Sequence, residues 1–306
     1  MSKTLRIGTR ASKLARAQAE SVRAQLEKTG HACELVLVKT SGDRIQDRPL
    51  HQVGGKGLFT KELEEALLAR EIDLAVHSMK DVPAVLPADL AIGAVLARED
   101  VRDAFVSHKA ASLDALPHGA RVGTSSVRRE AQIARARRDL QIVPLRGNVD
   151  TRLAKLDADE CDAILLAQAG LNRLGLGHRS TSRLPLETWL PALGQGAVGL
   201  EIRLDDELAR RAVAVLDDAP TATALACERA FQSALDGSCR TPIAGLATVA
   251  DGRLQFRGEV LSPDGSGSAA TELAFDLGSE PIETAAARGY AAGLDLRPRA
   301  HAWLAI

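Results

Sequence analysis

The sequence predicts an α/β protein made of two similarly built lobes, followed by a small α+β domain. Within the first 80 residues, apolar strand-like runs alternate with helical patterns, which is typical of a mostly parallel sheet. A similar alternation restarts after residue 103, and each stretch contains a strand that runs through Gly-Thr toward a serine at a helix start. After residue 220 the pattern changes to one helix and alternating strands around an Asp-Gly turn.

The individual elements follow from periodicity and from end signals. In the first lobe, a serine N-cap and a glycine stop delimit a helix. The expected elements there are strands over 5–9, 33–40 and 72–78 and helices over 12–30 and 58–70. The second lobe contains the strands ARVGTSS, LQIVPLRG and CDAILLA and the helices SVRREAQIARARR and 148–156. The last part contains helices over 221–235 and 282–294, two strands around the Asp-Gly turn and a third around TELAFDL.

Length and composition are those of a globular protein with several domains. The 306 residues exceed the roughly 250 that one core usually supports, and 45% are hydrophobic. The start, MSKTLRIGTR, lacks the apolar segment of a signal peptide, and no run reaches the roughly 18 apolar residues of a membrane span. We therefore expect a cytoplasmic protein without membrane contact. A net charge of −1 and 3% aromatic residues also argue against nucleic-acid binding.

The four cysteines are far apart, with no C-x-x-C pair and no histidine at metal-ligand spacing, so we expect no metal site. Cys33 and Cys161 begin apolar runs and Cys227 lies in a helical stretch, which predicts that all three are buried. Cys239 lies in a turn, DGSCRTP. From the residues alone it could be a small buried hydrophobe, half of a disulfide, a metal ligand or a nucleophile.

The segment VHSMKDVP (76–83) places adjacent lysine and aspartate residues, Lys80 and Asp81, at the end of an apolar strand. Open α/β sheets gather their ligand-binding groups at this edge. An ordinary solvated Lys-Asp turn is the alternative interpretation.

A second candidate is the segment from Arg121 to Arg152, which contains eight arginines and no lysine. Arg128 and Arg129 lie in the first turn of a helix, where positive charge opposes the helix dipole, so a bound carboxylate or phosphate would compensate it. Arg10 follows the first strand in the same way. A solvated basic face suits the residues farther from the strand ends, Arg135, Arg137 and Arg138. These residues predict a cleft between the lobes for a polycarboxylate or phosphate.

Eight sequence blocks occur in order along nearly the whole chain: IGTRAS, GGKGLFTKEL, AVHSMKDVP, GTSSVRR, LRGNVDTRL, AGLNRLG, PALGQGAVGLE and GSCRTPIAG. This ordered set resembles the porphobilinogen deaminase (hydroxymethylbilane synthase) family of tetrapyrrole biosynthesis. The resemblance implies a transferase that condenses four porphobilinogen units head to tail onto an enzyme-bound dipyrromethane primer. It further implies that ammonia is lost at each addition, that hydroxymethylbilane is released and that the enzyme is a monomer.

The resemblance also implies a domain division. Two lobes of the type II periplasmic-binding-protein kind would comprise residues 1–98 with 196–216, and residues 99–195. A C-terminal α+β domain with a small antiparallel sheet, residues 217–306, would carry the cofactor cysteine. A two-lobed cytosolic anion-binding protein without catalysis is the alternative, because fold alone does not decide function.

The resemblance assigns roles to individual residues. Cys239 would bind the dipyrromethane through a thioether, since an exposed thiolate is the competent nucleophile. Asp81 would be the catalytic acid and base. The other residues would bind the cofactor (Ser78, Lys80, Thr124, Ser125, Ser126, Arg128, Arg129, Arg152), bind substrate or assist elongation (Arg10, Ser12, Arg146, Arg173, Gln195), or lie in the family's mobile active-site loop (Lys56, Phe59).

Two stretches depart from the family pattern. Where many members have Ser-Pro-Leu-Ala, this chain has Ser12-Lys13-Leu14-Ala15, and where many have Gly-Cys-Gln it has Ser238-Cys239-Arg240. Neither difference removes a group that the chemistry requires, but the role of Arg240 stays open.

Overall fold

The computed structural model describes residues 4–44, 57–235 and 241–304. Within these residues the chain forms two compact units, one of residues 4–44, 57–99 and 197–222 and the other of residues 100–196, 223–235 and 241–304. None of the helices in this part of the chain has the length and apolarity needed to cross a bilayer. The three domain boundaries predicted from the sequence stay a prediction.

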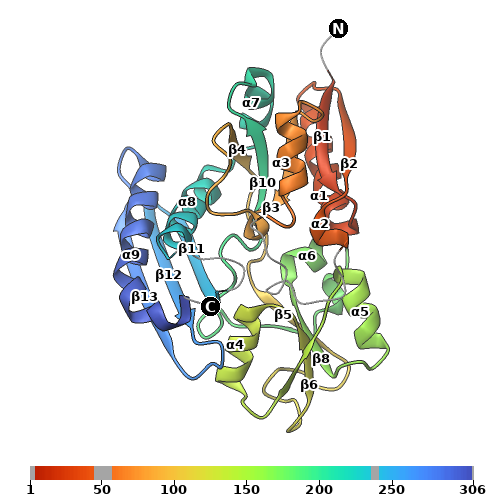
Figure 1. Ribbon diagram of the computed structural model, residues 1–306, viewed down its shortest axis with the longest axis vertical. Helices are drawn as coiled ribbons and strands as arrows, with labels where there is room; N and C mark the ends of the chain where they lie inside the picture. Colours follow the sequence, from red (N-terminus) through yellow and green to blue (C-terminus); the bar gives the residue numbers. More distant parts are fainter. Residues whose placement is uncertain (1–3, 45–56, 236–240, 305–306) are drawn as a thin grey trace. The chain divides into compact units, whose positions relative to one another are not determined.

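The first unit is built on a five-stranded sheet of order β2-β1-β3-β10-β4 (Figure 1). Strands β1, β2 and β3 are parallel, and β10 pairs antiparallel with both β3 and β4. Apolar side chains of α1, α7 and the sheet form its main core. The bounds are β1 Leu5–Arg10, α1 Lys13–Lys28, β2 Cys33–Val38, α2 Ser41–Arg44, α3 Lys61–Leu68, β3 Leu74–Ser78, η2 Met79–Asp81, β4 Leu90–Val95, β10 Val198–Arg203 and α7 Glu207–Ala214.

The second unit contains a five-stranded sheet of order β7-β6-β8-β5-β9. Strands β6, β7 and β8 are parallel, whereas β5 runs antiparallel to both β8 and β9. The bounds are β5 Asp103–Ser107, β6 Arg121–Thr124, α4 Val127–Ala136, β7 Gln141–Pro144, α5 Val149–Asp157, β8 Ala163–Ala167, α6 Gln168–Arg173, η3 Gly177–Arg179 and β9 Ser182–Arg183.

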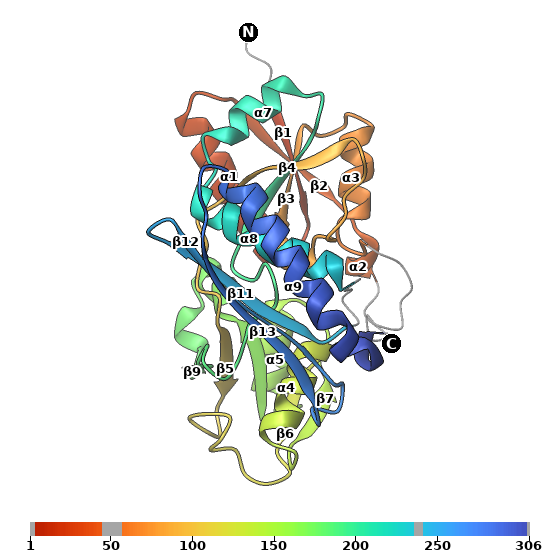
Figure 2. The same ribbon diagram turned by 90° about the vertical axis from the view of Figure 1, so that its left-hand side faces the viewer.

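The same unit also contains a three-stranded antiparallel sheet, β11-β12-β13. Side chains alternate between the two faces of this sheet, so Phe256 points into a core formed with α8 and α9 while its neighbour Arg257 points to the opposite face. Figure 2 shows α9 running along the sheet. The bounds are α8 Ala219–Ala234, β11 Ile243–Ala250, β12 Arg253–Leu261, β13 Ser268–Asp276 and α9 Pro281–Leu304.

These three sheets confirm the predicted fold class. Both five-stranded sheets are mostly parallel, and each contains one antiparallel strand in the fourth position, so the two lobes are similarly built. The third sheet is the small antiparallel sheet expected near the C-terminus, with its hairpin turn at Asp251 and Gly252.

Some local predictions were wrong. The last helix continues ten residues beyond the expected end at residue 294, to Leu304, with Pro298 inside it. Cys161 and Cys227 are buried as predicted, but Cys33 is only half-buried, because β2 is the outermost strand of its sheet. Edge strands leave part of their side chains accessible to solvent.

Candidate functional site

In the first unit, Arg10 and Ser12 lie where β1 ends and α1 begins. The Ser12 hydroxyl caps α1 by accepting a hydrogen bond from the backbone N–H of Ala15 (3.3 Å). The Arg10 guanidinium stacks on the ring of Phe59, with 4.1 Å from its central carbon to the ring centroid. The structure therefore brings together one residue predicted to bind substrate and one predicted to lie in the active-site loop.

Strand β3 is one of the two parallel neighbours of β1, so the carboxyl end of β3 lies at the same edge of the sheet. The hydroxyl of Ser78, the last residue of β3, pairs with the side-chain amide of Gln18 on α1 (3.1 Å). The chain then turns through Met79–Asp81, and the Met79 backbone N–H donates to the Ala197 carbonyl (3.0 Å). The residue directly before strand β10 therefore holds the start of the turn that carries Lys80 and Asp81.

Close packing beneath this turn depends on a glycine. Gly199 on β10 faces the Met79 side chain, and a Cβ atom at position 199 would overlap with the Met79 sulfur. The Asp81 carboxylate is partly exposed and has no hydrogen bond or ion pair with any residue that the structure describes. It is therefore open to a ligand.

A buried contact between a histidine and a glutamate begins on the same strand. The Nε2 atom of His77 is 2.9 Å from a carboxylate oxygen of Glu201 on β10, and both side chains are almost fully buried. Glu64 on α3 lies near this pair, and its pKa is raised, chiefly because burial disfavours its charged form. The sequence reasoning missed this pair, because the two residues are distant along the chain.

In the second unit, Asp103 connects several candidate residues. One carboxylate oxygen accepts hydrogen bonds from Arg129 Nη2 (2.7 Å) and Gln195 Nε2 (2.9 Å). The other accepts from the Trp189 indole N–H (2.8 Å) and lies 2.9 Å from Arg128 Nη1. Asp103 thus gathers two residues predicted to bind the cofactor and one predicted to bind substrate.

The position of Asp103 follows from strand direction. The carboxyl ends of the parallel strands β6 and β8 lie at one edge of the sheet, and Asp103 pairs with Ala167, the last residue of β8. Because β5 is antiparallel, its first residue lies at the edge where the parallel strands end. Asp103 is fully buried, yet the two guanidinium groups hold its pKa well below the ordinary value.

This arrangement corrects one inference from the sequence. The anion that compensates the arginines in the first turn of α4 is present within the chain, as Asp103. Both arginines are also buried, and burial lowers the pKa of Arg128. Arg128 Nη1 further donates to the Leu190 carbonyl (3.0 Å), and Arg129 Nη1 donates to the Leu165 carbonyl (2.9 Å).

The hydroxyl residues before α4 organise the local backbone. Ser126 is the N-cap of the helix and accepts from the Arg129 backbone N–H, and the Thr124 hydroxyl accepts from the Ser126 N–H (3.2 Å). The Ser125 hydroxyl accepts from the Leu145 N–H (3.0 Å), which joins the ends of β6 and β7. Arg146 follows directly after Leu145 and therefore lies at the same sheet edge.

Two further arginines donate to backbone carbonyls of the second unit. Arg152 Nε donates to the Gly147 carbonyl (2.8 Å), and Arg173 Nη2 donates to the Gly196 carbonyl (2.6 Å). Lys56 and Cys239 lie outside the described residues.

The prediction of a solvated face for Arg135, Arg137 and Arg138 was only partly right. Arg138 is exposed. Arg135 is exposed as well, but it also forms a bidentate ion pair with Glu259, and the half-buried Arg137 pairs with Asp139 through two hydrogen bonds.

Comparison with known proteins decides the family. The model of the family described as porphobilinogen deaminase, dipyromethane cofactor binding domain, matches residues 5–211, and that of the porphobilinogen deaminase C-terminal domain matches residues 222–297. The chain belongs to the porphobilinogen deaminase family. Proteins named porphobilinogen deaminase from Nitrobacter hamburgensis and Paracoccus denitrificans are 54% and 49% identical to it. These alignments cover 96% and 97% of this chain and 93% and 95% of the relatives.

Solved structures of binding proteins are more distant. A methionine-binding protein, MetQ, has a TM-score of 0.46 at 15% identity, covering 70% of this chain and 89% of its own. A periplasmic substrate-binding protein of an ABC transporter from Coxiella burnetii has a TM-score of 0.44 at 14% identity, covering 71% and 93%. Neither similarity bears on the ligand of this chain.

Proposed function

We propose that this chain condenses four porphobilinogen units head to tail with loss of ammonia and releases hydroxymethylbilane. The observation that carries the proposal is the match of two porphobilinogen deaminase domain models over residues 5–211 and 222–297, at about half identity to relatives of that name. We also propose that it works in the cytoplasm as a monomer.

The arginine pair fits the dipyrromethane cofactor. Two buried guanidinium groups share one carboxylate, Asp103, which leaves an excess of one positive charge. The Nε atoms of Arg128 and Arg129 are buried without a hydrogen-bond partner among the described residues, so these residues do not satisfy the pair completely. Such a site favours a ligand that carries carboxylates. When bound, the dipyrromethane supplies the primer to which pyrrole units are added.

The proposed anchor of the cofactor is Cys239. The three described cysteines are poor nucleophiles, because burial raises the pKa of Cys33 and Cys161 and raises that of Cys227 to about 12. Only the thiolate attacks carbon, so a thiol with such a pKa stays unreactive at neutral pH. This property of the other three cysteines supports a separate role for Cys239, the cysteine of the segment DGSCRTP.

The proposed acid and base is Asp81. Its carboxylate is accessible at the end of β3 and is not engaged by the described residues, and the Met79 backbone N–H fixes the start of its turn by donating to Ala197, the residue before β10. A proton delivered from this carboxyl to the departing amine would release ammonia, and the carboxylate could then remove the proton from the newly joined pyrrole carbon.

Asp81→Asn tests this role. The amide cannot exchange a proton, so kcat for porphobilinogen consumption should fall by about 10²- to 10⁴-fold, the usual contribution of general acid–base catalysis. Asp89→Asn, an exposed carboxylate of the same unit, is the matched control and should keep wild-type kcat. Unaltered turnover in Asp81→Asn would refute the mechanism.

A further inference from the structure

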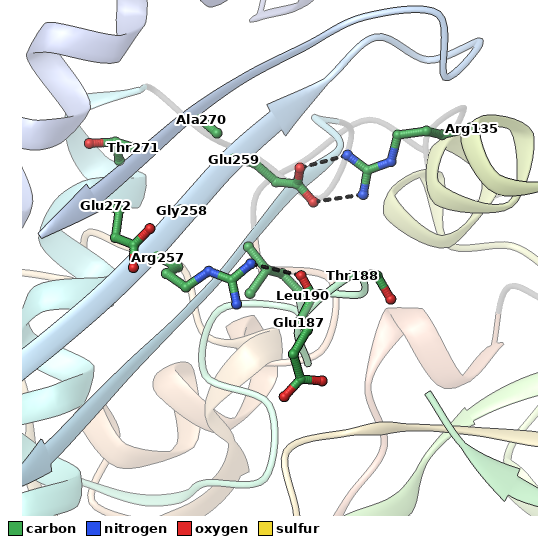
Figure 3. A pocket seen from close by; sticks show the side chains of 10 residues that line it. All are labelled: Arg135, Glu187, Thr188, Leu190, Arg257, Gly258, Glu259, Ala270, Thr271 and Glu272. Carbon is green, nitrogen blue, oxygen red and sulfur yellow. Dashed lines mark hydrogen bonds and ion pairs between the residues drawn. The ribbon is translucent and has the colours of Figure 1, made fainter. Parts of the chain in front are cut away.

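The three-stranded sheet contacts the second lobe through one of its faces. Residues of β12 and β13 line a pocket of about 480 Å³ together with Arg135 of α4 and with Glu187, Thr188 and Leu190 (Figure 3). Beside the pocket, Ala131 of α4 and Leu190 form a small apolar cluster with Ala244 and Leu261 of the sheet. This face therefore touches both the helix and the segment that surround the arginine pair.

Arg257 is the residue of this face that holds the segment. Its two terminal nitrogens donate to consecutive backbone carbonyls, Nη1 to that of Leu186 (3.1 Å) and Nη2 to that of Glu187 (3.0 Å). Figure 3 shows the guanidinium pointing from β12 toward Glu187 and Leu190. A planar guanidinium that binds two successive carbonyls restricts both the position and the direction of a turn.

The same segment contacts the arginine pair at its other end. The Trp189 indole N–H donates to Asp103 (2.8 Å), and the Leu190 carbonyl accepts from Arg128 Nη1 (3.0 Å) and from Gln132 Nε2 (3.0 Å). Residues 186–190 therefore form a short connection. Arg257 holds one end of it, and the other end holds both the carboxylate and one guanidinium of the buried ion pair.

A second contact holds α4 directly. Arg135, two turns after Arg128, forms a bidentate ion pair with Glu259, the next residue of β12 on the same face as Arg257. Figure 3 shows the two contacts on separate sides of the pocket. Helix α4 thus has a contact with the sheet that does not involve Arg257, so the effect of Arg257 on the segment can be measured separately.

We propose that Arg257 is a positioning residue for the buried arginine pair and that it acts through the segment Leu186–Leu190. Without its two hydrogen bonds the segment gains freedom, Trp189 loses its fixed contact with Asp103, and the Arg128 guanidinium is no longer held in one place. Binding of a carboxylate ligand to the pair then weakens. The proposal rests on the proposed function only in naming porphobilinogen and the dipyrromethane as sources of those carboxylates.

The test uses Arg257→Gln in the full-length protein. Trp189 and Trp303 are the two tryptophans of the chain, so a Trp303→Phe background makes fluorescence report on Trp189 alone. We expect the Trp189 emission to shift in Arg257→Gln and KM for porphobilinogen to rise roughly three- to tenfold, with kcat within about twofold of wild type. Arg257→Lys, which can restore one hydrogen bond, should recover part of both changes.

The matched control is Arg253→Gln, an exposed arginine of the same strand. Wild-type emission and KM in Arg257→Gln would overturn the proposal. A loss of both thermal stability and kcat in Arg257→Gln, with unshifted Trp189 emission, would also overturn it, because that result would indicate a merely structural role. If the parent protein does not turn over porphobilinogen, the proposed function fails. Comparison of the Trp189 emission of Arg257→Gln with that of Arg253→Gln still decides whether Arg257 positions Trp189.

Discussion

Replacing Asp103 by asparagine should destabilise the second unit strongly. The buried carboxylate binds Arg128, Arg129, Trp189 and Gln195 at 2.7–2.9 Å, so it contacts both guanidinium groups directly. Asparagine keeps the shape but removes the charge and turns one acceptor into a donor that faces cationic N–H groups. Breaking a buried ion pair from one side costs about 3–5 kcal/mol, because it leaves uncompensated charge in the interior.

The pH dependence of the unfolding free energy provides a second, independent test of this prediction. The folded pKa of Asp103 lies well below its unfolded value of about 4, so its stabilisation is fully present above that value and is lost as the pH falls toward the folded pKa. The difference in unfolding free energy between wild type and Asp103→Asn should therefore be constant between pH 6 and 8 and should shrink below about pH 4.

Urea unfolding followed by Trp189 fluorescence in the Trp303→Phe background measures this difference, since the Trp189 indole contacts the Asp103 carboxylate. Asp276→Asn removes an exposed acid of the same unit and should leave the transition unchanged. A midpoint for Asp103→Asn equal to that of Asp276→Asn would refute the account of the buried pair.

The remaining predictions concern packing and thiol chemistry. Gly289→Ala should lower the free energy of unfolding by about 1–3 kcal/mol. The new methyl group would overlap with the Cys227 carbonyl where α9 crosses α8. Thermal unfolding of this variant, compared with that of Ala287→Gly at an exposed position of α9, measures the effect. Cys227, with a pKa of about 12, should resist a thiol reagent at pH 8 in the native protein and react after unfolding, as thiol titration with mass mapping would show. Rapid native labelling of Cys227 would contradict its buried environment.

Much of the fold could be predicted from the sequence, because periodicity and helix caps are local signals. Ser12 and Ser126 cap α1 and α4 as expected, and the alternation of strands and helices predicts both mostly parallel sheets. The antiparallel strands β5 and β10 were not predicted, since the direction of a strand depends on partners that are distant in sequence.

The contacts of the candidate site were harder to predict for the same reason. The arginines at the start of α4 indicated a nearby anion, but the identity of Asp103 as that anion depends on the antiparallel direction of β5. The sequence feature that could have indicated Asp103 as this anion is its place as an acidic residue at the first position of the apolar strand DAFVS. The His77–Glu201 pair likewise joins residues of β3 and β10, which lie more than 120 positions apart.

The most direct test of the proposed function is an intact mass of the purified protein beside those of Cys239→Ala and Cys33→Ala, with an Ehrlich's-reagent colour test on each. We expect a mass increase of two linked pyrroles and a positive colour in wild type and Cys33→Ala, and neither in Cys239→Ala. A wild-type chain with the mass of its bare sequence, colourless even after incubation with porphobilinogen, would contradict the assignment of Cys239 as the cofactor anchor and the synthase activity that depends on it.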